Sequence, residues 1–223
     1  MHQAISHIWN TKTRNEKNIE KIIKENITEY VNKSLLSQGD KEALKQELID
    51  NASIVSRALR GHFDVPFKVS TEKWVETPFD STFDNEKITI PIHGKLDAII
   101  DSGDSVNVFD YKTKQGMTEK AIRGETKNDD GIYFRQLVFY KMLLLGDFYT
   151  RNKNILTSLV FVSPDSYGNC PIVTLKVEDE DIRKVKEEIN DLIRVVWSGT
   201  IAKKYCNDST CEYCAYRRLA TRD

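Results

Sequence analysis

The spacing of apolar residues along the chain changes from helical to strand-like after the first quarter. Residues 1 to about 61 repeat apolar side chains at helical intervals, and a helix is predicted over residues 19–35. A second helix is predicted from Asp40, a good N-cap residue, to Gly61, a plausible stop. From about residue 67 apolar and polar residues alternate, which is typical of half-buried strands. The strands predicted there cover residues 67–77, 87–101 and 105–112.

The second half of the chain returns to a helical pattern and then alternates again. The pattern predicts a helix over 131–149, strands near 156–163 and 171–177, and a last helix over about 179–197 with acidic residues in its first turn. This order of elements predicts one α/β domain, residues 1–223, with a mixed central sheet flanked by helices. Its expected parts are a helical extension (1–61), a core (67–198) and a cysteine-containing tail (199–223).

The composition is that of an ordinary globular protein. Of the 223 residues, 39% are hydrophobic and 30% charged, and 33 Lys and Arg face 34 Asp and Glu. The net charge of -1 does not indicate any particular binding partner, so any nucleic-acid contact has to rely on local positive charge. No apolar run approaches the ~18 residues of a membrane span, and the first residues lack a secretory signal. We therefore expect no membrane contact and a cytoplasmic location.

Residues 93–115 form the most informative segment of the chain. Gly103 and Asp104 suit a two-residue turn, and such a turn places Asp97 opposite Asp110 on one face of a hairpin. Two carboxylates held directly opposite each other repel unless a cation or a proton lies between them, and a hard divalent cation fits such oxygen ligands. Lys112 projects from the same face because it is two residues beyond Asp110.

A second interpretation of this hairpin stays open at this stage. The opposite face carries apolar side chains and reads as a core face: Leu96, Ala98, Ile100, Phe109 and Tyr111. In this second interpretation the charged face is solvated surface and not a metal site. The spacing of the residues alone does not decide between the two interpretations.

The sequence of the hairpin resembles the motif of a known family. Gly94–Asp97 followed by Val108–Thr113 resembles the G-x-x-D … (V/I)-x-D-Y-K-T signature of the PD-(D/E)XK nucleases, most closely their RecB-like branch found in helicase–nuclease proteins. The Q-x-x-x-Y element of that branch is matched by Gln136 and Tyr140, which share a helical face, although plain amphipathic packing also produces that spacing.

The resemblance implies a restriction-endonuclease-like core and metal-dependent hydrolysis of phosphodiester bonds in DNA. Asp97 and Asp110 are then ligands of Mg²⁺ or Mn²⁺, helped by the Tyr111 carbonyl, and Lys112 positions the nucleophile. Gln136 and Tyr140 hold the metal-site strand or the substrate.

Two further positions match the family's pattern. Glu76, in the segment Trp74–Phe79, resembles the acidic residue of an E-x-P-F strand and is a candidate catalytic residue, with a structural or surface role as the alternative. His2 matches the family's first-helix histidine and is a candidate metal ligand, with His7 as the second choice and a frayed terminus as the structural alternative.

Three of the four cysteines lie in the tail. Cys211 to Ala220 resembles the C-x-x-C-x-Y-R-x-x-C ending of the family's iron–sulfur members, except that Ala220 occupies the last cysteine position. Cys206 is the candidate third ligand and Cys170 a distant fourth, for a [4Fe–4S] cluster or for Zn²⁺. A vestigial tail is the third alternative.

DNA is the expected partner, and basic residues after the hairpin are candidates for phosphate contacts. They are Lys112, Lys114, Lys120, Arg123, Lys127 and Arg135. Residues 114–130 are predicted to form a loop that orders over DNA. By resemblance the reaction is exonucleolytic and belongs to DNA repair or recombination, with a helicase as partner or on the same parent chain. The alternative is a catalytically inactive DNA-binding or assembly module.

Overall fold

The computed structural model describes residues 1–200, 206 and 210–220. The helices of the first part are α1 (His2–Asn10), α2 (Glu16–Lys33) and α3 (Gln38–Phe63). They are followed by the strands β1 (Lys68–Phe83), β2 (Glu86–Asp101) and β3 (Ser105–Lys112). The second half contains α4 (Glu119–Ile122), α5 (Ile132–Gly146), β4 (Asn154–Phe161), β5 (Ile172–Leu175), α6 (Asp179–Trp197) and α7 (Glu212–Ala220).

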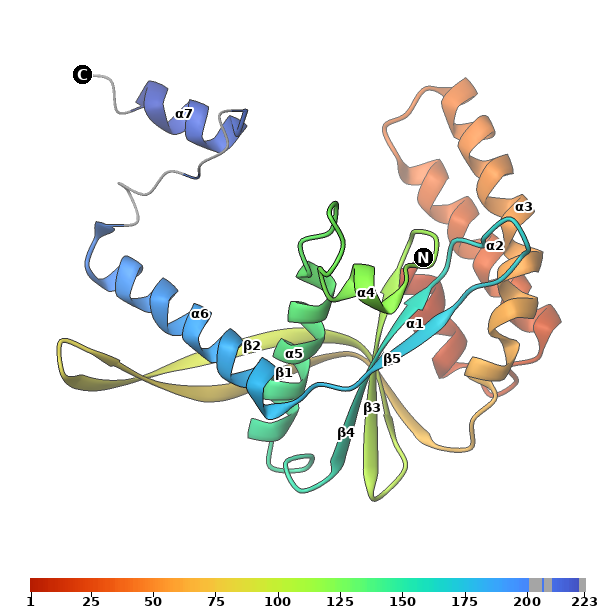
Figure 1. Cartoon of the computed structure of the whole chain (residues 1–223). Helices are drawn as coiled ribbons and strands as arrows, with labels where there is room; N and C mark the ends of the chain where they lie inside the picture. The colour runs from red at the N-terminus through yellow and green to blue at the C-terminus, as the bar shows by residue number, and fades with distance from the viewer. Residues whose placement is uncertain (201–205, 207–209, 221–223) are drawn as a thin grey trace.

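The strands form one mixed sheet in the order β1-β2-β3-β4-β5, which confirms the predicted architecture. Only β3 and β4 run parallel, while every other neighbouring pair is antiparallel. The parallel pair requires a crossover, and α5 provides it. The β1–β2 hairpin extends well beyond the other strands, with α6 alongside it (Figure 1).

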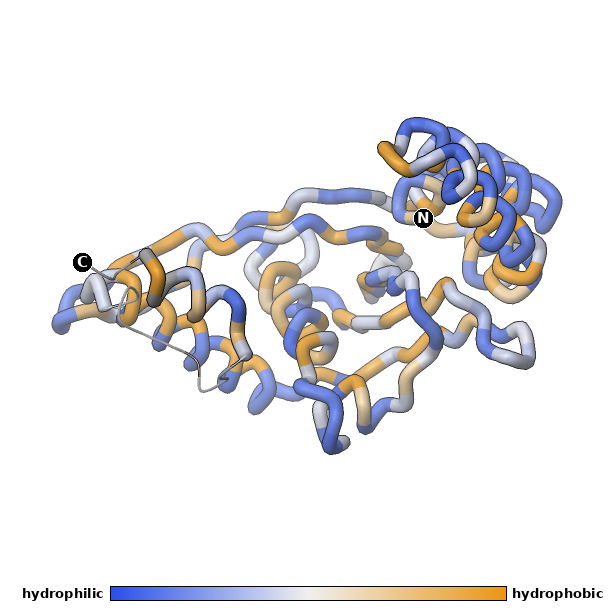
Figure 2. Tube along the Cα trace, turned by 90° about the horizontal axis from the view of Figure 1, so that it is seen from above, coloured by the Kyte–Doolittle hydropathy of each residue, from blue (hydrophilic) through white to orange (hydrophobic). Residues whose placement is uncertain are grey.

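Helices cover both faces of the sheet. Helices α1–α3 pack on one face, around a buried cluster that includes Tyr111 and Phe63, and α5 packs on the other face through Leu137 and Leu143. Helix α5 is apolar nearly all round, and its tube is mainly orange in Figure 2. An apolar helix of this kind is buried on several sides. Asp110 is buried and Asp97 and Lys112 are half-buried, so these three side chains do not lie on an open solvated face, whereas Lys95 is exposed.

The β1–β2 hairpin exchanges its faces near Glu72. Val69 packs against the α1–α3 cluster, whereas Val75, an even number of residues later on the same strand, packs under α5. Glu72 between them has a φ of 53°, a left-handed conformation that interrupts the strand alternation. The predicted core face is wrong at Leu96, because β2 exchanges its faces at the same level, where Asp97 is left out of the register: Leu96 packs under α5, although Ala98 packs under α1–α3.

Several predicted boundaries also differ from the structure. The N-cap of α3 is Ser37 and not Asp40, because the Ser37 hydroxyl accepts a hydrogen bond from the Asp40 amide. The helix continues past Gly61 to Phe63. The predicted loop over 114–130 contains the short helix α4, and the tail contains α7, although neither was predicted. Part of the predicted tail, 199–223, lies outside the described residues, and the division into parts stays a prediction.

Within the described part of the chain, none of the helices combines the length and the apolar character needed to cross a membrane.

Candidate active site

The hairpin of β2 and β3 has the register expected from its turn. Ala98 pairs with Phe109 and Ile99 with Val108, and Gly103 in the turn has a φ of 94°. The pairing of β2 with β3 ends at Ala98 and Phe109, so Asp97 and Asp110, the next residues along the two strands, are not paired with each other, and Asp110 pairs with Leu159 of β4 instead. Both carboxylates line one pocket of about 520 Å³.

Three potential ligand atoms converge beside Asp97. Its Oδ2 accepts a hydrogen bond from the Tyr111 amide at 3.0 Å and lies 3.3 Å from Nε2 of His2. The same nitrogen is 3.0 Å from the Tyr111 carbonyl oxygen. The hydrogen bond to Asp97 is the main reason why the pKa of His2 lies above its ordinary value, and partial burial opposes it. His7, the second choice from the sequence, instead contacts Asn26 at 3.2 Å.

Asp110 is held by three side chains. Its Oδ1 accepts hydrogen bonds from Gln136 Nε2 at 2.8 Å and from the Tyr140 hydroxyl at 3.1 Å. Its Oδ2 lies 2.7 Å from the Lys112 ammonium nitrogen. Gln136 also accepts a hydrogen bond from Lys112 at 2.7 Å and donates one to Tyr140 at 2.7 Å. The predicted Gln136 and Tyr140 pair therefore fixes one carboxylate oxygen and leaves the other toward Lys112.

The electrostatics of Asp110 favour a bound cation. The side chain is only 3% exposed, and this burial raises the pKa of its carboxyl group. The Lys112 ammonium opposes the rise, and the negative charge of Asp97 adds to it. Although Oδ2 is close to Lys112, it accepts no hydrogen bond of acceptable geometry from the residues that the structure describes. In the structure the Lys112 ammonium balances the charge of this oxygen, and a divalent cation bound between the two carboxylates would share that role.

The donor set fits a hard divalent cation. Two carboxylates, a backbone carbonyl and an imidazole face one pocket, and cations such as Mg²⁺ and Mn²⁺ prefer oxygen-rich sites of this kind. The ligands come from α1, β2 and β3, so the site exists only when the helical layer is docked on the sheet.

Tyr133 is a lining residue that the sequence analysis missed. Its ring lies 4.6 Å from the Lys112 ammonium nitrogen and 5.1 Å from that of Lys114. The contact limits the positions open to Lys112, because a cation over an aromatic face is attracted to it. The sequence contains a signal for it, since Tyr133 precedes Gln136 by one helical turn.

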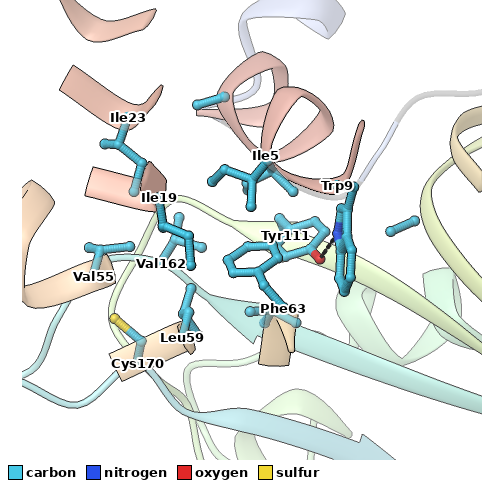
Figure 3. Packing of buried hydrophobic residues seen from close by; sticks show 14 of the residues in the cluster. Ile5, Trp9, Ile19, Ile23, Val55, Leu59, Phe63, Tyr111, Val162 and Cys170 are labelled. Atoms are coloured by element: carbon cyan, nitrogen blue, oxygen red, sulfur yellow. Dashed lines mark hydrogen bonds between the residues drawn. The ribbon is translucent and has the colours of Figure 1, made fainter. Parts of the chain in front are cut away.

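A second set of contacts fixes Tyr111 from behind the pocket. Its hydroxyl accepts a hydrogen bond from Trp9 Nε1 at 2.9 Å and lies 2.7 Å from Nε2 of His62. Figure 3 shows Tyr111 between Trp9 of α1 and Phe63 of α3. These contacts join the helical layer to the residue whose carbonyl faces the pocket. Sequence reasoning missed Trp9 and His62 because they act only through this long-range packing.

Glu76 is not brought to this pocket. It is an exposed residue of β1, paired with His93 of β2, and its neighbour Val75 points under α5. Because neighbouring strand residues point to opposite faces, Glu76 points away from α5. The sequence motif alone did not reveal this, since the exchange of faces at Glu72 decides it.

Some of the predicted phosphate contacts have partners within the chain. Arg123 pairs with Glu119 and Arg135 with Glu188, both at 3.0 Å, which reduces the charge they offer to a ligand. Lys112 and Lys114 line the pocket.

The three tail cysteines lie together. The sulfur atoms of Cys206, Cys211 and Cys214 are all within 4.8 Å of one another. Cys170, the expected fourth ligand, is instead buried in the α1–α3 cluster, and burial raises the pKa of its thiol to about 11. A [4Fe–4S] cluster or a structural Zn²⁺ site takes four protein ligands, so the three tail thiols do not complete either set.

Comparisons with known proteins agree with this geometry. A family model described as the PD-(D/E)XK nuclease superfamily matches residues 1–219. The chain therefore belongs to the PD-(D/E)XK nuclease superfamily, and its mixed sheet flanked by helices is a restriction-endonuclease-like α/β fold. A comparison with curated proteins gives no match.

Two solved structures are similar to the chain at low identity. One is SSO0001, at 16% identity and a TM-score of 0.36 over 90% of this chain and 95% of that one. The other is the "Putative exonuclease" from Eubacterium rectale, at 13% identity and a TM-score of 0.45 over 92% of this chain and 75% of that one.

Proposed function

We propose that this chain is a metal-dependent DNA nuclease whose cation is held by Asp97, Asp110, the Tyr111 carbonyl and His2. The observation that carries the proposal is the buried Asp110 carboxylate, which lines one pocket with Asp97 and has one oxygen paired only with the Lys112 ammonium. The PD-(D/E)XK nucleases generally use divalent metals such as Mg²⁺ or Mn²⁺, in agreement with this donor set.

The residues around the pocket divide the work of phosphodiester hydrolysis. A divalent cation supplies activation of the attacking water and neutralisation of phosphate charge. Lys112, held between Asp110 and Gln136, presents an ammonium group that orients the nucleophile and attracts the scissile phosphate. Gln136 and Tyr140 act as positioning residues, because they fix Asp110 Oδ1 and so aim Oδ2 into the pocket.

The test is cleavage of end-labelled single- and double-stranded DNA with Mg²⁺ or Mn²⁺. We expect cleavage by the wild-type chain and a loss of at least 100-fold, on the order of the effect of removing one transition-state contact, in Asp110→Asn and Lys112→Ala. Lys184→Ala is the matched control, because this lysine is exposed on α6 outside the pocket. Circular dichroism of each variant confirms folding.

The competing function is an inactive nuclease-fold module that only binds DNA or a protein. It predicts DNA binding without cleavage by the wild-type chain under all metal conditions. Retention of DNA binding together with absence of turnover overturns the enzymatic proposal.

The motif likeness to RecB-like members extends the proposal to exonucleolytic processing of DNA ends in the cytoplasm during repair or recombination, with a helicase as partner or parent chain. Product ladders from substrates labelled at either end test the exonuclease: mononucleotide release from one end supports it, and internal cuts in circular DNA contradict it. Co-purification of a helicase with the tagged chain tests the partner.

A further inference from the structure

A second pocket adjoins the candidate metal site. It has a volume of about 540 Å³ and lies between α1, α2, α3 and the segments that follow β3 and β4. His2 and Thr113 line both pockets, so the two are adjacent. A volume of this size is ordinary for a small-molecule site.

The two pockets differ in charge. The first contains two aspartates and two lysines, whereas the second is lined by no Asp, Glu, Lys or Arg side chain, and its titratable groups are the Met1 amino group and His2. The second is lined by apolar side chains such as Ile27, Val55 and Val162, the last two labelled in Figure 3. Its polar side chains include three amides: Gln3, Asn26 and Asn51. A flat heterocycle with hydrogen-bonding edges suits such a mainly apolar lining with amide groups.

An aromatic residue stands at the rim of this pocket. Tyr30 of α2 is 73% exposed, although it lines the pocket. It also borders a smaller polar hollow of about 350 Å³, which shares Gln3 and Asn26 with the second pocket. An exposed tyrosine ring at the mouth of a mainly apolar cavity is positioned to stack on a base that enters it.

We propose that the second pocket receives an unpaired nucleobase of the strand being cleaved, next to the phosphate held in the metal site. Tyr30 stacks on the base, and the amides of Gln3, Asn26 and Asn51 bind its edges. The inference rests on the proposed nuclease function and specifies its substrate. A base that is stacked and paired in a duplex does not enter such a pocket, so the substrate is single-stranded DNA or a frayed end.

The test combines a change in the protein with a change in the DNA. Single-stranded oligonucleotides carry one abasic residue, moved stepwise along the strand, and kcat/KM is measured for wild type and Tyr30→Ala. We expect one position at which loss of the base slows the wild-type enzyme about tenfold, as stacking of one base predicts. Tyr30→Ala slows cleavage of the intact strand by a similar factor and shows no further loss with the abasic residue at that position.

Tyr149→Ala is the matched control, since Tyr149 is 77% exposed and lines neither pocket. Equal rates on all abasic strands together with an unaffected Tyr30→Ala overturn the base pocket and leave the nuclease intact. An equal loss in Tyr149→Ala also overturns it. Absence of both cleavage and DNA binding, measured with Ca²⁺ in place of Mg²⁺, overturns the nuclease function itself and the pocket with it.

Discussion

Acidification is expected to weaken the attachment of the helical layer to the sheet, through His62. This side chain is packed among the rings of Trp9, Phe63, Phe109 and Tyr111, and burial lowers its pKa from 6.5 to about 4. Between these two pH values the unfolded chain binds the proton and the folded chain does not, so stability falls as the pH falls. The contribution of His62 is fully present above pH 6.5 and is lost by about pH 4.

The size of the effect follows from the difference between the two pKa values. Each pH unit corresponds to roughly 1.4 kcal/mol, so the folded state loses about 3 kcal/mol through His62 on acidification. His62→Phe keeps an aromatic ring in place, removes the titration, and gives up the contact with the Tyr111 hydroxyl, which still has Trp9 as donor. At neutral pH we expect this variant to be less stable than wild type by about 1 kcal/mol.

The assay is urea unfolding of wild type and His62→Phe at several pH values between 7.5 and 4. Other titrating groups, including Asp110 and His2, are common to both proteins, so the difference between their curves isolates His62. We expect the wild type to lose about 3 kcal/mol more than the variant across this range. Parallel curves, or a His62 pKa near 6.5 by NMR, refute the reasoning.

Three further predictions concern the pocket and the packing around it. Gln136→Met removes the amide that joins Asp110 to Lys112. We expect kcat to fall by about tenfold or more with little change in KM, since one charge-assisted hydrogen bond corresponds to about 1.5–3 kcal/mol. An unchanged kcat contradicts the positioning role of Gln136. Gly146→Ala places a Cβ 2.7 Å from the Thr77 Cβ, and we expect it to destabilise the folded state by about 1–3 kcal/mol. In Gly61→Ala, within α3, the new Cβ meets nothing within 4 Å, so this variant is expected to stabilise the folded state by up to about 1 kcal/mol. Equal effects of the two variants in urea unfolding contradict the packing. Mg²⁺ at about 100 times its Kd is expected to raise the thermal midpoint by roughly 5–10 °C, and Asp110→Asn is expected to abolish this shift. The shift weakens on acidification, because the raised pKa of Asp110 favours its protonation. A shift retained in the variant places the ion elsewhere.

Much of the pocket could be predicted because local rules determine it. The glycine-containing turn at Gly103 fixes the register of the hairpin, and strand alternation then places Asp97, Asp110 and Lys112 on one side. Helical spacing does the same for Gln136 and Tyr140. Each of these inferences depends on residues close together in the sequence.

The remainder depends on backbone conformation and long-range packing. Glu72 adopts a positive φ although it is not a glycine, and beyond it Glu76 points away from the pocket. The neighbouring strand exchanges its faces at the same level, so Leu96 packs under α5. Trp9 and His62 reach Tyr111 only after the helices dock on the sheet. Spacing in one sequence carries no signal for contacts made across such distances along the chain.

The central claim is that the carboxylates of Asp97 and Asp110 share one divalent cation. The most direct measurement is a crystal soaked with Mn²⁺, with anomalous diffraction recorded for wild type and Asp110→Asn. We predict an anomalous peak between the two carboxylates, within about 2.5 Å of an oxygen of each, and its loss in the variant. A saturated wild-type crystal with no peak there, or with a peak only at another place such as the tail thiols, contradicts the account.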